Sequence, residues 1–289
     1  MGDLAHTARP VWTADYHIHT EYSNDCRMPM EQLVQEAIRL GLDEICFTDH
    51  VDYGVKWDRD DPAAAPYFHT EPFPRLNVDY PRYVQQVLAL REKYAGRITL
   101  RLGMEFGMQV YTIPRYEALF ARWPLDFVLL SVHQVEDREF WNQDFQRGRT
   151  QEEYQQRYYQ ELLALVQRYH HYSVLAHMDL VARYDPAGPY PFEALRPVLT
   201  EILRTVIADG KGLEVNTSCH RYGLQDLTPS RDILRLYRDL GGRILTLGSD
   251  SHKPGHLGAY LSETRQQLRE LGFAQWCTFD RMEPVFHPL

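Results

Sequence analysis

The stretch Asp15–Asp25, which reads DYHIHTEYSND, follows a short apolar and aromatic run near the N-terminus. That run predicts a strand, and side chains of a strand alternate between its two faces, so His17 and His19 point to the same side. Two imidazoles on one side can bind a single divalent cation, and Asp25 supplies a carboxylate one loop later. A lone His-x-His pair is a weak sign of metal binding, so its meaning depends on the rest of the chain.

The composition of the 289-residue chain narrows the possible functions. Its 44% hydrophobic and 25% charged residues are typical of a soluble globular protein, long enough for one large α/β domain or two small ones. The formal net charge of −9 argues against a nucleic-acid partner, because binding to a phosphate backbone requires clustered Lys and Arg. A small phosphorylated substrate needs only one or two local arginines and is compatible with this charge.

Cysteine spacing and hydropathy indicate where the protein works. Cys26, Cys46, Cys219 and Cys277 are widely separated and form no C-x-x-C pair, which favours reduced thiols over a disulfide framework. Residues 1–14 lack the apolar core of a signal peptide, and no later run is long enough to span a bilayer. We therefore expect a cytoplasmic protein without a membrane partner.

Predicted strands and helices alternate along the whole chain. Apolar residues at helical spacing predict helices over residues 30–40, 80–94, 116–123, 151–171, 192–209, 230–240 and 258–271. Short apolar runs predict strands over residues 44–48, 98–104, 126–131, 172–176, 212–215, 243–247 and 273–279. This alternation predicts a parallel sheet with helical crossovers, and about seven such units in a single domain over residues 1–289 suit a closed or distorted barrel. An open doubly wound sheet is the alternative, disfavoured because no Gly-rich dinucleotide fingerprint follows the first strand.

Two polar insertions, residues 51–77 and 134–150, directly follow predicted strand ends and should overhang one rim of the sheet. The first insertion offers carboxylates for a substrate ammonium group and aromatic faces for a ring or a cation. The alternative is that its aromatic residues only anchor a long loop to the barrel. The residues concerned are Asp52, Tyr53, Trp57, Asp58, Asp60, Asp61, Tyr67 and Phe68.

The C-terminal ends of the predicted strands share one property, which is that nearly all carry metal-ligating side chains. In chain order they are His17/His19, Asp49/His50, Glu105, His133, His177, Glu214/Asn216 and Asp250/His252. In a parallel barrel these ends converge on one rim, where such enzymes keep their active sites. A single catalytic zinc uses three protein ligands, so this surplus predicts two or three divalent ions with Glu105 or Asp250 bridging a pair. Any one of these residues alone could be structural.

These positions also resemble the motifs of the polymerase-and-histidinol-phosphatase (PHP) superfamily. The matching segments are His17-x-His19, Thr48-Asp49-His50, Glu105, Ser131-Val132-His133, Ala176-His177-x-Asp179 and Gly248-Ser249-Asp250-Ser251-His252. The resemblance implies a distorted, TIM-like (β/α)₇ barrel with a trinuclear zinc, iron or manganese site at the C-terminal rim of its strands. It assigns His17, His19, Glu105 and Asp250 to one ion, Glu105, His133 and His177 to a second, and Asp25, His50 and His252 to a third.

Within the superfamily, the chain is most similar to the histidinol-phosphate phosphatase group. The similarity rests on chain length, on the insertion after His50 and on the segment Glu214-Val215-Asn216-Thr217-Ser218. It implies hydrolysis of L-histidinol phosphate in histidine biosynthesis, with another small phosphate ester, such as a nucleotide or a sugar phosphate, as the alternative substrate. Where many members of the group have Gly after Asn-Thr-Ser, this chain has Cys219; where some have His, it has Asp25.

The resemblance also implies catalytic roles for Arg183, His220 and Asp25, the last also being a metal ligand. Metal ions would generate hydroxide for in-line attack on phosphorus, with Arg183 clamping the phosphate. His220 would hold a phosphoryl oxygen or protonate the leaving alcohol. Asp49 and Asp179 are expected to orient metal-bound histidines.

Two other classes of protein use similar residues. A metal-dependent amidohydrolase would be expected to carry a modified lysine on a strand, whereas Lys56, Lys93, Lys211 and Lys253 fall in predicted loops or helices. A non-catalytic binding module with a decayed site would not be expected to keep this complete ligand set. Cys219 has no obvious base beside it in the sequence, which favours a structural thiol over a nucleophile.

Overall fold

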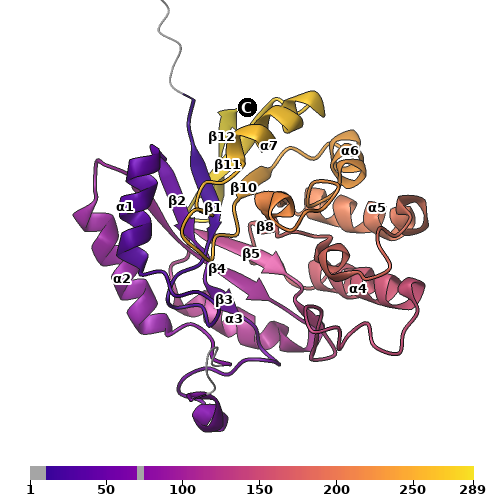
Figure 1. The fold of residues 1–289 in the computed structure, drawn as a ribbon, viewed down its shortest axis with the longest axis horizontal. Coiled ribbons are helices and arrows are strands. Elements are labelled where there is room, and N and C mark those ends of the chain that lie inside the picture. The colour runs from indigo at the N-terminus through magenta and orange to yellow at the C-terminus, as the bar shows by residue number, and fades with distance from the viewer. Residues whose placement is uncertain (1–10, 70–74) are drawn as a thin grey trace, which may run out of the picture.

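The computed structural model describes residues 11–69 and 75–289 of the chain. Residues 1–10 and 70–74 lie outside this part, so the expectation for the N-terminal segment and a portion of the first insertion fall outside the described residues. Within the described part, parallel strands follow the order β1-β2-β4-β5-β8-β9-β10, with β3 paired to β4 (Figure 1). The strands are β1 Ala14–Ile18, β2 Glu44–Phe47, β3 His50–Val51, β4 Thr99–Gly107, β5 Phe127–Ser131, β8 Val174–Leu175, β9 Gly212–Asn216 and β10 Leu245–Gly248.

The two end strands of this order meet, so the sheet curls into a nearly closed barrel. Just beyond β10, Ser251 bridges in parallel to Ile18. The His19 backbone N–H donates to the Ser251 carbonyl at 3.0 Å, and the Ser251 N–H donates to the His17 carbonyl at 3.2 Å. These bonds exclude the open doubly wound sheet and confirm the distorted seven-stranded barrel.

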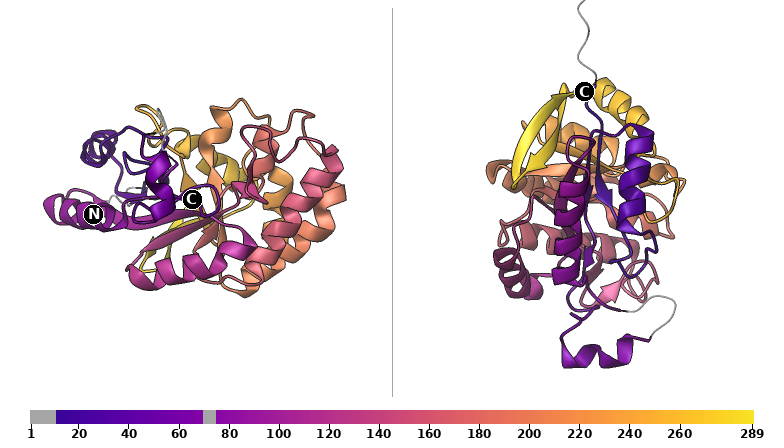
Figure 2. Two further views of the ribbon diagram at one scale, coloured as in Figure 1. Left: turned by 90° about the horizontal axis from the view of Figure 1, so that it is seen from below. Right: turned by 90° about the vertical axis from the view of Figure 1, so that its left-hand side faces the viewer.

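Helices surround the barrel because each has one apolar face (Figures 1 and 2). In α1, Leu33, Val34 and Ala37 are buried, and the helix stops at Gly41, whose φ of 76° suits glycine. None of the helices in the described residues is long and apolar enough to cross a membrane. The helices are α1 Met30–Leu40, α2 Tyr80–Lys93, α3 Ile113–Arg122, α4 Gln151–Val166, α5 Phe192–Ala208, α6 Arg231–Asp239 and α7 Leu261–Glu270.

The C-terminal segment departs from the predicted pattern. The expected last strand forms β11 Gln275–Asp280, which pairs antiparallel with β12 Glu283–Pro288 and is not part of the barrel. The Phe279 N–H donates to the hydroxyl of Tyr16 at 2.7 Å, which ties this hairpin to β1. The pattern of alternating strands and helices suggested a further barrel unit here, but a tight turn between two adjacent strands produces a hairpin instead.

Short elements line the connections above the strand ends. In the second insertion, β6 Gln134–Val135 and β7 Arg138–Glu139 form a small antiparallel hairpin. The 3₁₀ helices are η1 Pro62–Tyr67, η2 Val110–Thr112, η3 Leu180–Tyr184 and η4 Thr217–His220. Of these elements, β7 and η3 contribute residues that line the cavity of the candidate site.

Candidate active site

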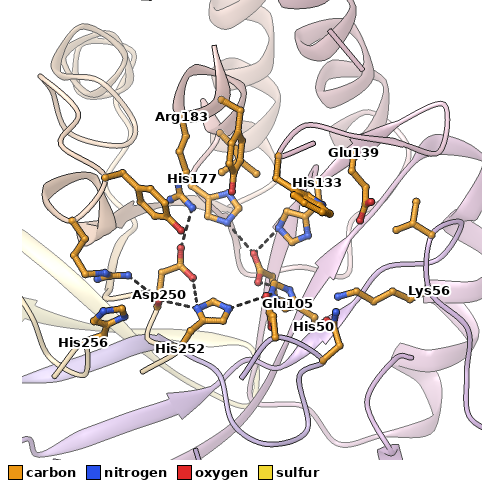
Figure 3. Close-up of a pocket in the computed structure, with 18 of the residues that line it drawn as sticks. His50, Lys56, Glu105, His133, Glu139, His177, Arg183, Asp250, His252 and His256 are labelled. Atoms are coloured by element: carbon orange, nitrogen blue, oxygen red, sulfur yellow. Dashed lines mark hydrogen bonds and ion pairs between the residues drawn. The ribbon is translucent and has the colours of Figure 1, made fainter. Parts of the chain in front are cut away.

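The structure brings the nine predicted metal-ligating residues together at the C-terminal ends of the strands. Figure 3 labels several of those that line the cavity, among them Glu105 and Asp250. They come from β1, β3 and β4 and from the loops that follow β1, β5, β8 and β10, so no two adjacent elements could form the cluster alone. One detail differs from expectation, since Glu105 lies inside β4 rather than after it. The nine are His17, His19, Asp25, His50, Glu105, His133, His177, Asp250 and His252.

Glu105 is the centre of the cluster. Its Oε1 lies 3.0 Å from His133 Nε2 and 2.9 Å from His177 Nε2. Its Oε2 lies 3.2 Å from His17 Nε2 and 3.0 Å from His50 Nδ1. The side chain is fully buried. A single carboxylate therefore faces histidines on both sides, which is the arrangement that a bridging ligand requires.

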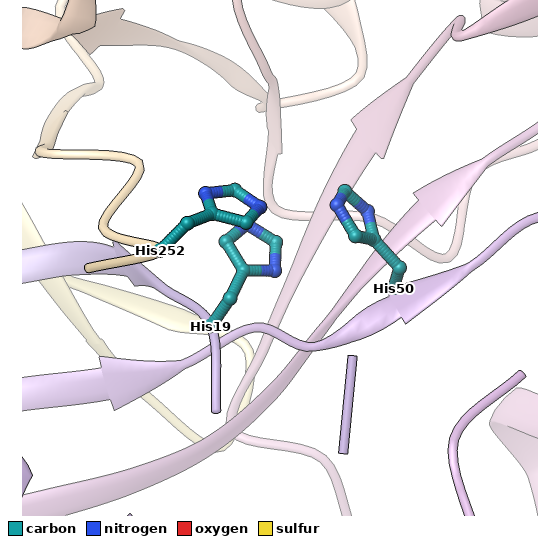
Figure 4. A group of neighbouring side chains, drawn as sticks. All are labelled: His19, His50 and His252. Carbon is teal, nitrogen blue, oxygen red and sulfur yellow. The ribbon is translucent and has the colours of Figure 1, made fainter. Parts of the chain in front are cut away.

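Two aspartates complete the cluster on either side of Glu105. Asp250 Oδ1 is 3.5 Å from His19 Nε2, and Asp25 Oδ2 is 3.5 Å from His50 Nε2 and 3.3 Å from His252 Nε2. Figure 4 shows His19 between His50 and His252, with ring centroids 4.2 and 3.9 Å away. Each aspartate thus lies close enough to neighbouring histidines for one cation to bind to both residue types.

Several buried polar atoms of the cluster lie 3.0–3.5 Å from one another but form no hydrogen bond of good geometry among the described residues. They are His17 Nε2, His19 Nε2, His50 Nδ1 and Glu105 Oε2. Leaving such atoms unsatisfied costs about 1–3 kcal/mol each, so they require something else to bind. Sets of three candidate ligand atoms from these residues lie within 4.8 Å of one another, and imidazole with carboxylate suits zinc, iron or manganese. The donor set therefore fits divalent metal ions.

Electrostatics point the same way. Burial lowers the pKa of His17, but Glu214, Glu105 and Asp250 outweigh it and raise that pKa well above its usual value. For His19, burial together with neighbouring histidines holds the pKa well below its usual range. The two histidines closest in sequence therefore prefer opposite protonation states, because the cluster has too many imidazoles for all to carry a proton. Cations in place of protons would relieve this conflict.

Carboxylates that contact the ring nitrogens on the far side from the cluster fix the orientation of its histidines. Glu214 Oε1 lies 2.5 Å from His17 Nδ1, and Asp52 Oδ1 lies 2.7 Å from His133 Nδ1. An ionised carboxylate can only accept, so each Nδ1 carries the proton and each Nε2 faces the cluster as a possible ligand. Glu214 Oε2 also accepts from the His177 backbone N–H at 2.9 Å.

Two glycines make room for these supporting carboxylates. A Cβ on Gly107 would lie 2.6 Å from His133 Nδ1 and would overlap Oδ1 of Asp52. A Cβ on Gly248 would overlap both the Glu214 carboxylate and His17. Backbone and side chain approach too closely at both positions for any other residue.

The structure corrects the expected roles of Asp49 and Asp179. Asp49 acts indirectly, because it accepts from the hydroxyl of Ser23 at 2.6 Å, and Ser23 Oγ in turn lies 3.1 Å from His19 Nδ1. Asp179 accepts from the Ser230 N–H at the start of α6, at 2.8 Å, and contacts no histidine of the cluster. Being two residues from His177 placed it near the site in sequence, but its side chain points toward α6.

Arg183 and His220 have different surroundings. Arg183 is 5% exposed, lines the cavity, and its Nη1 lies 3.3 Å from Asp250 Oδ2, while Nη2 donates to Ser218 Oγ at 2.6 Å. His220 stacks on Tyr260 with ring centroids 4.6 Å apart and is not among the residues that line the cavity. The structure therefore places Arg183 beside the cluster and gives no support to a contact between His220 and phosphate.

Cys219 is buried, which raises the pKa of its thiol and disfavours a nucleophilic role.

A cavity of about 800 Å³ lies above the cluster. Two cationic side chains that line it were not predicted from the sequence as site residues. Arg221 lines it, with its guanidinium held by the Ser249 and Asp250 carbonyls at 2.7 and 2.9 Å. Lys56 lines it as well and pairs with Asp52 at 2.6 Å. Arg221 stands three residues after Ser218, the last residue of the Asn-Thr-Ser segment, and this position was a usable signal for it. No sequence pattern predicts that the Lys56 side chain points into the cavity, because its loop has no periodicity.

The first insertion contributes less to the cavity than expected. Of its described residues, Val55, Lys56 and Arg75 line the cavity, whereas none of the eight acidic and aromatic residues singled out in the sequence does. Tyr53 is buried against the ring of Tyr116, and Asp58 accepts from the hydroxyl of Tyr80 at 2.6 Å. Tyr53 therefore fits the alternative interpretation, in which the aromatic residues anchor the loop, and Asp58 helps to hold the same loop in place.

Comparisons with known proteins agree with this geometry. A family model described as the PHP domain matches residues 15–218. The chain is 31% identical over 275 residues to the histidinol-phosphatase of Lactococcus lactis, covering 93% of this chain and 95% of that protein. It is 27% identical over 265 residues to the probable histidinol-phosphatase of Deinococcus radiodurans, covering 89% and 93%. A crystal structure of the Lactococcus lactis histidinol phosphate phosphatase, complexed with zinc, L-histidinol and phosphate, matches with a TM-score of 0.79 at 31% identity and covers 94% of this chain and 98% of that one.

Proposed function

Because this chain belongs to the PHP domain family, we propose that it is a metal-dependent phosphomonoesterase that hydrolyses L-histidinol phosphate to L-histidinol and phosphate. The observation that carries this conclusion is the cluster of histidines and carboxylates with unpartnered, inward-facing atoms at the base of a cavity lined by Arg183 and Arg221. The relative that binds zinc, L-histidinol and phosphate supports the choice of substrate.

We assign the ligands to two or three divalent ions, which can be zinc, iron or manganese. Glu105 is the proposed bridge, because its two oxygens face different histidines. Such ions, when bound, neutralise charge on phosphoryl oxygens and lower the pKa of water. The proposed sets are His17, His19, Glu105 and Asp250; Glu105, His133 and His177; and Asp25, His50 and His252.

The chain's own cations complete the phosphate site in this proposal. Arg183 is buried and held by Asp250 and Ser218, so its guanidinium is preorganised to hold a phosphoryl oxygen. Asp25 is the most exposed ligand of the cluster, with 41% of its side chain accessible, so it is the ligand that an entering substrate reaches most directly. Negative charge on the phosphoryl oxygens would therefore be met by Arg183 on one side and by a divalent ion held in part by Asp25 on the other.

Release of phosphate from a panel of monoesters tests this function. We expect kcat/KM for L-histidinol phosphate to exceed that for a nucleotide monophosphate or a hexose phosphate by about 10²-fold or more, since a site built for polar groups rejects analogues that lack them. A higher kcat/KM for the nucleotide or the sugar phosphate would overturn the proposed substrate and leave a phosphoesterase of another specificity.

A further inference from the structure

The metal cluster and Arg183 account for only one part of the proposed substrate. L-Histidinol phosphate also carries an ammonium group and an imidazole ring, and discrimination between phosphate esters requires that the protein contact them. A cavity of about 800 Å³ is large enough to hold all three groups. The residues that line it outside the cluster are therefore the candidates for recognising the amine and the ring.

One carboxylate stands apart from the cluster. Among the described residues that line the cavity, Asp25, Glu105 and Asp250 belong to the cluster, and Glu139 is the remaining acidic side chain. It lies on β7, paired across the small hairpin with Gln134, the residue that follows His133. Figure 3 shows Glu139 on the side of His133 and Lys56, across the cluster from Arg183 and His256. The hairpin therefore holds this carboxylate at a set position relative to a cluster histidine.

The charges around Glu139 leave it available to a ligand. Lys56, a buried cation that lines the same cavity, pairs with Asp52 at 2.6 Å, and Asp52 acts on it more strongly than Glu139 does. Arg75 lies 3.5 Å from Glu139 Oε2 and is 48% exposed, and ion pairs of this kind contribute little. Asn142 also approaches Oε2, at 3.5 Å, whereas no contact to Oε1 is found among the described residues. A substrate ammonium can therefore reach this carboxylate without breaking a strong interaction.

An aromatic side chain lies two residues further on. Trp141 lines the same cavity and is 62% exposed, which is unusual for the largest apolar side chain. Its indole face is suited to stacking against an imidazole or an imidazolium ring. A carboxylate and an indole from one short segment thus face the cavity together.

We propose that Glu139 binds the ammonium group of the substrate and that Trp141 contacts its imidazole ring, so that the second insertion, not the first, determines specificity. This inference rests on the proposed function and names the part of the chain that reads the leaving group. Neither residue takes part in the chemistry at phosphorus, so both act on recognition.

Comparing wild type and one variant on two substrates, with and without the amino group, isolates the contact between the protein and the amine. The variant is Glu139→Gln, and the analogue is L-histidinol phosphate with hydrogen in place of the amino group. In the wild-type enzyme, removing the amine should lower kcat/KM about tenfold to hundredfold, the value of one hydrogen bond between charged groups. In Glu139→Gln the two substrates should be hydrolysed with nearly equal kcat/KM, because the partner of the amine is gone. The change should lie mainly in KM.

Controls separate recognition from damage to the protein. Asp144→Asn removes a carboxylate from the same insertion, where it is exposed and paired with Arg147 at 3.0 Å outside the cavity. This variant should keep the wild-type preference for the amine. Trp141→Ala should raise KM for both imidazole-bearing substrates. Metal content and kcat for the aryl phosphate should match the wild type in all three variants.

The outcomes distinguish this inference from the function on which it rests. If Glu139→Gln kept the full preference for the amine, or lost activity equally on all substrates, the assignment of Glu139 would be wrong while the enzyme remained a histidinol-phosphate phosphatase. If the wild-type enzyme did not hydrolyse L-histidinol phosphate but hydrolysed other esters, the proposed function itself would fail.

Discussion

Replacing Glu214 with Gln should weaken metal binding and turnover about tenfold to hundredfold without unfolding the barrel. The carboxylate serves two histidines at once, with Oε1 2.5 Å from His17 Nδ1 and Oε2 accepting from the His177 N–H at 2.9 Å. Glutamine offers one acceptor oxygen and one NH₂ group, so it can satisfy one of these donors and must face the other with a donor of its own. Losing one buried hydrogen bond to a charged group costs about 1.5–3 kcal/mol, or about tenfold to hundredfold in an equilibrium constant.

The loss should fall on metal affinity, because Glu214 fixes which nitrogen of His17 faces the cluster. Competition with a chromophoric chelator measures the zinc Kd, and phosphate release from L-histidinol phosphate measures kcat/KM. Glu44→Gln is the matched control, since Glu44 is also buried but bonds to Tyr16 and Arg101 at the opposite end of the barrel. The control should lower Tm and leave the zinc Kd unchanged. Wild-type zinc affinity in Glu214→Gln would refute the reasoning.

Three further substitutions test the cluster and its neighbours. Elemental analysis of protein prepared without chelators should find more than one divalent ion per chain, and at most one ion would contradict the multinuclear site. Glu105→Ala should lose both metal and activity, because five histidines face the two oxygens of Glu105. Arg183→Ala should keep its metal but lose about 10²-fold in kcat/KM through weaker stabilisation of transition-state charge, and near wild-type kinetics would return Arg183 to a structural role. His220→Ala should keep kcat/KM close to the wild type, because the ring stacks on Tyr260 outside the cavity; a loss as large as that of Arg183→Ala would show that His220 reaches the substrate.

The barrel and the gathering of histidines and carboxylates at its rim could be predicted from the sequence because both follow from local patterns. Helix α1 begins and ends at the residues that its apolar spacing and Gly41 predict. His17, His50 and His133 each lie at or just after the end of an apolar run, and parallel topology carries all such ends to one rim.

What the sequence could not determine depends on where individual side chains point. Asp179 and His220 lie next to cluster or phosphate segments in sequence, but one turns toward α6 and the other toward Tyr260. Residues in short 3₁₀ segments and irregular loops have no periodicity from which a direction can be read. Their environment is decided by packing against other parts of the chain.

The sequence by itself determined the architecture, the candidate metal ligands and the class of chemistry, since each depends on residue type and position along a strand. Only the tertiary structure decided which carboxylates support the histidines and which wall of the cavity can read a substrate amine. Glu214 and His17 are 197 residues apart, and Glu139 reaches the cavity only because a small hairpin folds back after β5. Contacts of this kind arise when the barrel closes, because closure brings strand ends and loops that are remote in sequence to a common rim.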